Sequence, residues 1–122
     1  MTAPVLIGHR GDTLTGTLPC LTDITAWTPR WVAKAAANWE NTLDAAATLV
    51  ATVGAGLTVT DPVAGTIDLL IAASVTATLV PGVYVWELQL TNGTTVRTVE
   101  WDALGSTTGV LTISADVVRT TP

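Results

Sequence analysis

Alternating hydrophobic and polar residues are clearest in the stretch from Gly82 to Asp102, where two strand-like runs flank Asn92-Gly93. Asn and Gly accept the positive φ angles of a type I′ turn, so this dipeptide predicts a tight hairpin. A two-residue turn there fixes the register of the two strands. The expected pairs are Leu90–Thr95, Leu88–Arg97, Trp86–Val99 and Tyr84–Trp101.

The two faces of this hairpin differ in character, because successive side chains of a strand point to opposite faces. A slip of one residue would bury Glu87 and Glu100, so we expect a firmly set register. The first face should line a core and comprises Tyr84, Trp86, Leu88, Leu90, Val99 and Trp101. The second face is more polar and comprises Val83, Val85, Glu87, Gln89, Val96, Thr98 and Glu100.

Shorter runs elsewhere also indicate strands. Thr13–Leu18 and Leu57–Thr60 alternate, and Gly65–Ile71 places Ile67, Leu69 and Ile71 on one face. Leu21–Trp27 is typical of a short strand or an extended loop, and Ser74–Leu79 of a single helical turn with Ser74 as N-cap. Gly109–Ile113 is the last expected strand, and Ala115–Val118 extends it or lies at its edge.

Local propensity leaves the region between these strands open. Trp31–Ala37 suits a strand with Trp31, Ala33 and Ala35 on one face, but its alanines also suit a helix. Asn41–Val50 looks locally helical, whereas Leu49–Val53 is rich in β-formers. We favour strand for the whole region, because its neighbours are so plainly β.

Short strands separated by Gly, Pro and Asp turns about every ten residues predict an all-β, immunoglobulin-like β-sandwich. The 122 residues fit a single domain, 1–122. Hydrophobic residues make up 48% and charged residues 12%, so the surface must be rich in Thr, Ala and Ser. Some apolar surface should remain exposed, which indicates packing against other subunits or, equally, a neutral composition bias.

The charge and cysteine content narrow the function classes. Five Lys and Arg against ten Asp and Glu give a net charge of −5, which argues against nucleic acid and against an electrostatic membrane anchor. Cys20 is the single cysteine, so no internal disulfide and no thiolate metal site are expected. No signal peptide and no apolar run of membrane-spanning length are present, which indicates a protein made in a cytoplasm.

Several segments together carry a family likeness. They are a GDT near the N-terminus, then GAGLTVTDPVAGTIDLLI, ATLVPGVYVWELQLTNG and TVEWDALGSTTGVLTISADVV. The most specific part is Leu-x-Pro-Gly-x-Tyr-x-x-Glu-Leu-x-Leu at Leu79–Leu90, followed by a strand ending in Thr112-Ile113. Over about Arg10 to Val118, the chain resembles the N-terminal domain of the phage baseplate upper protein family and small phage structural proteins like it.

The resemblance implies an immunoglobulin-like docking module of a phage particle, without catalysis and without a cofactor. The baseplate family carries further domains after this one, whereas this chain stops at Pro122. We therefore expect an accessory virion protein, either a capsid decoration or a head–tail or tail-tip adaptor. Its partners would be capsid, portal or tail components, and it would form a homo-oligomer or sit in many copies on the particle.

Two short motifs have plain structural explanations, and the single histidine lacks partners. Arg10-Gly11-Asp12 matches the integrin-recognition triplet, but we expect a turn that opens the first long strand. Asn92-Gly93-Thr94 fits the glycosylation sequon, yet the hairpin turn already explains it. His9 is the single histidine and lacks the partners that a catalytic triad or a metal site requires, and no serine lies in a nucleophile elbow. We therefore predict no catalytic residues and no metal site.

Four residues are the candidate interface. Trp27 and Trp39 are flanked by polar residues, and Trp is a common interface hot spot, whereas Trp31 is expected in the core. Glu87 and Glu100 share the polar hairpin face, where a cation or a partner's Arg could bridge them. The alternative function is a host-surface or carbohydrate-binding module, since exposed Trp rings stack on sugars.

Overall fold

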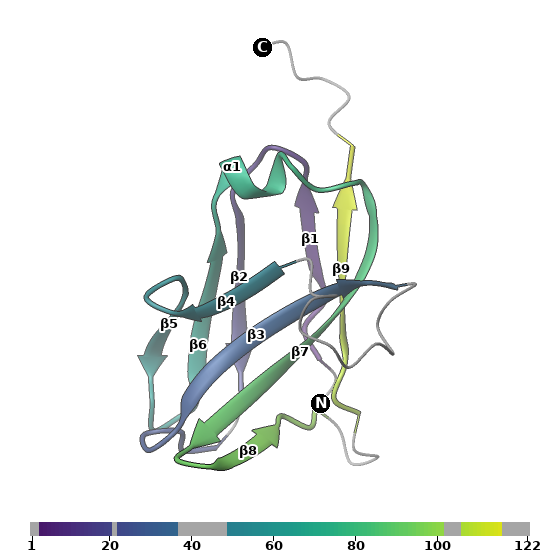
Figure 1. The fold of residues 1–122 in the computed structure, drawn as a ribbon. Helices are drawn as coiled ribbons and strands as arrows, with labels where there is room; N and C mark the ends of the chain where they lie inside the picture. The colour runs from purple at the N-terminus through teal and green to yellow at the C-terminus, as the bar shows by residue number, and fades with distance from the viewer. Residues whose placement is uncertain (1–2, 21, 37–48, 102–105, 116–122) are drawn as a thin grey trace.

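The computed structural model describes residues 3–20, 22–36, 49–101 and 106–115, and its architecture is all-β (Figure 1). A nine-stranded sheet has the order β1-β9-β7-β3-β4-β5-β6-β2, with β8 paired to β7. The strands are β1 Leu6–His9, β2 Leu14–Pro19, β3 Thr28–Ala35, β4 Leu49–Val53, β5 Gly56–Asp61, β6 Thr66–Ile71, β7 Gly82–Asn92, β8 Thr95–Thr98 and β9 Gly109–Ser114.

The sheet is rolled so that its two ends approach each other. In Figure 1, β3 and β7 run diagonally in front of β2 and β6. The chain passes between these two layers at the turn around Gly54, where β4 and β5 pair in parallel. The end strands β1 and β2 meet through side chains: Leu6 lies so close to Gly16 that a Cβ there would be 2.6 Å from Leu6 Cδ2. The result is nearly a barrel with one continuous interior.

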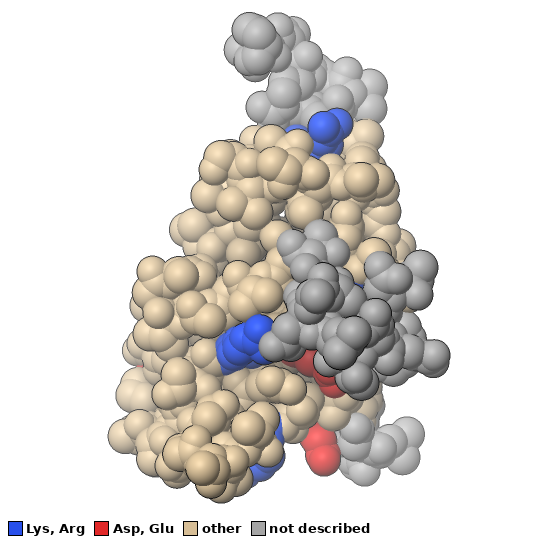
Figure 2. All heavy atoms as spheres, viewed as in Figure 1, with Lys and Arg blue, Asp and Glu red and all other residues tan. Residues whose placement is uncertain are grey.

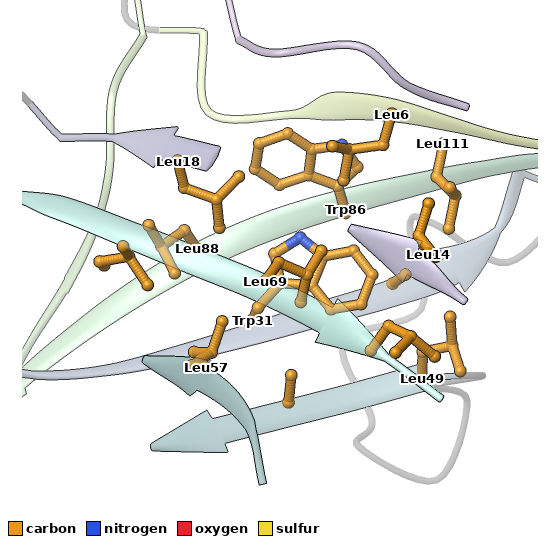
Figure 3. Close-up of a cluster of buried hydrophobic side chains, with 14 of the residues drawn as sticks. Leu6, Leu14, Leu18, Trp31, Leu49, Leu57, Leu69, Trp86, Leu88 and Leu111 are labelled. Atoms are coloured by element: carbon orange, nitrogen blue, oxygen red, sulfur yellow. The ribbon is translucent and has the colours of Figure 1, made fainter. Parts of the chain in front are cut away.

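The interior is filled by aliphatic and Trp side chains from nearly every strand (Figure 3). Trp31 and Trp86 are fully buried, with ring centroids 6.3 Å apart, and Trp86 meets Trp101 edge-on at 5.6 Å. Gly109 is required beside them, because a Cβ there would lie 2.2 Å from the Trp86 ring. The three indole N–H groups have no hydrogen-bond acceptor in the described part of the chain, so ring packing must outweigh that cost.

The hairpin forms with the predicted faces but not with the predicted turn. All six residues assigned to the core face are buried. The expected register is wrong by two residues, since Asn92 pairs with Thr95 and Leu90 with Arg97. Gly93 has a φ of +61°, and Gly93-Thr94 forms the turn, so Asn92 remains in the strand. A shift of two leaves every side chain on its face, because the alternation has a period of two.

The ambiguous region contains two strands. β3 occupies Thr28–Ala35 and buries Trp31 and Ala33 between β4 and β7. The strand alternative is therefore correct for Trp31–Ala35, whereas Ala36 lies beyond the strand and Ala37 outside the described residues. β4 confirms strand for Leu49–Val53. The rest of Asn41–Val50, and Ala115–Val118 beyond its first residue, lie outside the described residues. The short helix α1 spans Ala73–Thr76 and has Ala72, not Ser74, as N-cap, without a side-chain cap bond.

Candidate functional site

The first candidate surface is an aliphatic outer face on strands β1, β9 and β7. Ile7 lies opposite Thr112, which on its other side lies opposite Val83, so these residues form one row across three strands. Val110 and Val85 are paired in the next row. Ile7 is 67% exposed, Val83 51% and Val110 42%. We call this surface, made of Ile7, Val83, Val85, Val110 and Thr112, the aliphatic face.

The five residues of the aliphatic face are uncharged, and Lys34 of β3 lies at its border, opposite Val85. Cross-strand neighbours in a sheet are in contact, so its members form a contiguous patch rather than scattered exposed side chains. Charge is thinly spread elsewhere too, since Figure 2 shows few blue or red atoms on the side that it displays. An uncharged patch lets two surfaces approach without desolvating ions, which is a cost that burial of a charge always brings.

The second candidate surface is a groove of about 350 Å³ beside strand β8. One wall is the consecutive run Arg97–Glu100, and the other comes from Cys20 and Thr22 after strand β2. It is an open groove of mixed polar and apolar lining. We call it the β8 groove.

Arg97 is held in place by an aromatic ring. Its guanidinium carbon lies 5.3 Å from the centroid of the half-buried Trp27 ring, which is cation–π geometry. Arg97 follows the core-face alternation of β8, but it lies at the end of the interior and is exposed. The guanidinium covers one face of Trp27, so a sugar would have to displace Arg97 to stack on that face.

Cys20 is a half-buried thiol in the same groove. Burial raises its pKa from 9.0 to about 11, although the nearby positive charge of Arg97 acts in the opposite direction. The thiolate is the nucleophilic form of cysteine. At neutral pH, Cys20 is therefore an unreactive apolar part of the groove wall.

The predicted interface residues do not form one site. Trp27 and Glu100 both lie near Arg97, since Trp27 stacks on its guanidinium and Glu100 lines the groove. Glu87 is half-buried and accepts a 2.7 Å hydrogen bond from the Thr107 hydroxyl. Val99 donates its N–H to the Leu88 carbonyl. Glu87 precedes Leu88 and Glu100 follows Val99, so the two glutamates are the next residues along these antiparallel segments. Trp39 lies outside the described residues.

The Arg10-Gly11-Asp12 triplet is built into the fold. Arg10 Nε donates to the Ala77 carbonyl at 3.1 Å, and Gly11 N–H donates to the Thr76 hydroxyl at 3.1 Å. The same hydroxyl donates to the Asp12 carbonyl at 2.6 Å. These bonds fasten the turn between β1 and β2 to α1, which fits the structural explanation of the triplet.

No cluster of three or more His, Cys, Asp or Glu with metal-binding geometry occurs in the described ranges. Nor do the helices of those ranges include one of the length and apolarity that crossing a membrane takes. A scan against protein-family models and a search of curated proteins both find no match to this chain.

Sequence reasoning missed Arg97 and the aliphatic face. The expected hairpin register gives Arg97 only a place opposite Leu88, whereas its stacking on Trp27 joins residues 70 positions apart. Val83 and Val85 were assigned to the polar face of the hairpin, although both are aliphatic. Only the pairing of β1 and β7 with β9 brings Ile7 and Val110 beside them. An exposed alternation of valines in β7 was the one signal available.

Proposed function

We propose that this protein is a non-enzymatic structural protein of a bacteriophage particle, which docks onto other virion subunits. The observation that carries the proposal is the aliphatic face, a contiguous uncharged patch on a protein of net charge −5. Patches of this kind mark protein interaction sites more often than ordinary surface. The resemblance to phage baseplate upper proteins in the Leu79–Leu90 segment supports the particle as the setting.

The proposal includes many copies for each particle, as a capsid decoration or as an adaptor at the head–tail junction or tail tip. Symmetric assemblies repeat one contact at every equivalent position. Each contact of the aliphatic face can then be small, because the same contact is repeated in every copy on the particle. Ile7 and Val83 would be the central anchors, since both project from the row through Thr112.

We further propose that the rolled sheet is an immunoglobulin-like sandwich. Its order supports two layers: β1, β9, β7, β3 and β4 in one, and β2, β6 and β5 in the other. Such a division corresponds to a G-F-C-type sheet with two added strands, β1 and β4, packed on a B-E-D-type sheet. The parallel pairing of β1 with β9 and the antiparallel pairing of β2 with β6 fit that scheme.

A tyrosine supports the same assignment. Tyr84 is near the start of β7, and its hydroxyl donates a 2.5 Å hydrogen bond to the Val80 carbonyl four residues upstream. In immunoglobulin-like domains, a tyrosine at the equivalent corner between two layers bonds back to the preceding backbone. Here the corner also contains α1, which links β6 to β7.

Two experiments test the function. Immunogold labelling first locates the protein on particles of the phage that encodes it. Binding of the purified protein to those particles is then measured. Val83→Glu places a charge in the aliphatic face and should weaken binding at least tenfold, about 1.4 kcal/mol. Leu70→Glu is the matched control: Leu70 is 53% exposed, but on β6, in the other layer. Both variants should keep the wild-type melting temperature, since both sites are exposed.

Label over the head identifies a decoration protein, and label at the tail or its tip an adaptor. Particles without label overturn the proposal. If Val83→Glu and Leu70→Glu weaken binding to the particles equally, the aliphatic face is not the surface that binds them. Binding to a glycan panel that is lost on Trp27→Ala would replace it with the carbohydrate-binding function.

A further inference from the structure

We propose that the free edge of strand β8 is a docking site for an extended peptide segment of a partner protein, which adds to the sheet as a further strand. The segment carries an acidic side chain that pairs with Arg97 and a basic side chain that pairs with Glu100. This inference rests on the proposed function, because it names one contact by which the protein binds a virion subunit.

The backbone of β8 supplies the main-chain part of the site. The Val99 N–H bonds to Leu88 of β7, and the residues of an antiparallel strand alternate in the direction of their N–H and C=O groups. Arg97 and Val99 therefore bond toward β7, and Val96, Thr98 and Glu100 point their backbone groups away from it. Within the described ranges these outward groups meet no backbone partner. A row of unpaired backbone groups is a template for another strand.

The β8 groove supplies room beside that edge. Four of its lining residues are the consecutive run Arg97–Glu100, so the groove lies along the last two residues of β8 and the two residues that follow the strand. Its opposite wall at Cys20 and Thr22 limits the space to about 350 Å³. That volume is near the lower end of about 300–1,000 Å³ for small-ligand pockets. It accommodates one or two side chains of an added strand, but not a folded domain.

The charges of the groove define the partner's chemistry. Arg97 makes its cation–π contact with Trp27, and no carboxylate among the described residues is in ion-pair contact with it. Its planar guanidinium is thus positioned for a carboxylate, which it binds through two parallel hydrogen bonds. Glu100 is exposed and offers a carboxylate to a cation. Because residues three apart on a strand point to opposite faces, the partner's acid and base should also be an odd number of positions apart.

The experiment begins with a randomised heptapeptide library panned on the immobilised full-length protein. We expect enrichment of β-branched sequences with Asp or Glu and Lys or Arg an odd number of positions apart. On Arg97→Glu the acidic preference should change to Lys or Arg, and on Glu100→Lys the basic preference to Asp or Glu. Lys34→Glu is the matched control, since it makes the same change of charge on β3, beside Val85 rather than the groove. It should retain the wild-type preferences.

A second measurement does not depend on any variant. An enriched peptide, synthesised and added to the wild-type protein, should slow amide hydrogen exchange at Val96, Thr98 and Glu100 at least tenfold. Arg97 and Val99 should exchange as before, because their N–H groups already bond to β7. Protection of all five amides alike, or of none, would contradict strand addition.

The edge proposal and the proposed function fail separately. If no peptide is enriched over the bare matrix, or the same peptides are enriched on Arg97→Glu, the edge proposal is wrong even where the protein binds particles. If peptides bind with the expected protection but the wild-type protein is absent from particles, the edge proposal stands and the virion function falls.

Discussion

At the scale of single residues, Cys20 shows how the fold sets the chemistry of a side chain. Burial raises the pKa of its thiol from 9.0 to about 11, although the positive charge of Arg97 acts in the opposite direction. Below pH 9 this shift lowers the fraction of thiolate about a hundredfold. Iodoacetamide should therefore alkylate Cys20 about 100-fold more slowly in the folded protein at pH 8 than in guanidinium-unfolded protein. Arg97→Gln should slow the folded reaction further, because Arg97 favours the thiolate. Equal rates in the folded and unfolded protein would show that the thiol is not buried.

The same residue predicts a pH dependence of stability. Because the pKa is higher in the folded state, its contribution is fully present below pH 9 and is lost as the pH rises toward 11. The free energy of unfolding, measured by denaturant titration, should fall over that window. Cys20→Ser should show a smaller fall, and the difference between the two proteins isolates the thiol from other groups that titrate there.

At the scale of elements, Thr76 joins the helix α1 to the turn between β1 and β2. Its fully buried hydroxyl accepts from Gly11 N–H and donates to the Asp12 carbonyl. Thr76→Val keeps the shape but leaves these backbone groups unpaired, so the free energy of unfolding should fall by about 1–3 kcal/mol. Thr76→Ser retains the hydroxyl and should lose less, although it also loses a buried methyl group. A Val variant as stable as the wild type would mean that the hydroxyl contributes nothing.

The hairpin of β7 and β8 separates what a sequence pattern can predict from what it cannot. Alternation identified Tyr84, Trp86 and Val99 as core residues, because burial repeats every second residue in any register. The turn was misplaced by one position, since both Asn92-Gly93 and Gly93-Thr94 offer a residue that accepts a positive φ. Packing decides between them: the observed register continues so that Leu88 meets Val99 and Trp86 approaches Trp101.

At the scale of the whole molecule, the sequence indicated an all-β chain but not the order of its strands. Pairings such as β1 with β9 join residues more than 100 positions apart, and no local pattern in Leu6–His9 names Gly109–Ser114 as its neighbour. Both candidate surfaces depend on such pairings. The aliphatic face requires β1 beside β9, and the β8 groove requires the segment after β2 beside β8. The sequence contains the individual residues of both surfaces, whereas their arrangement side by side is a property of the rolled sheet.

That rolled sheet predicts cooperative unfolding. One buried cluster includes Leu6 and Leu14 from the two ends of the sheet, together with Trp31 and Trp86 at its centre. Neither layer can separate without exposing the apolar surface of the other, so partly folded states should be unfavourable. We expect guanidinium unfolding curves from Trp fluorescence and from far-ultraviolet circular dichroism to coincide. Leu6→Ala should lower both midpoints equally, with a loss of about 2–5 kcal/mol. Separate midpoints would show that the two layers unfold independently and that closure through β1 and β2 contributes little.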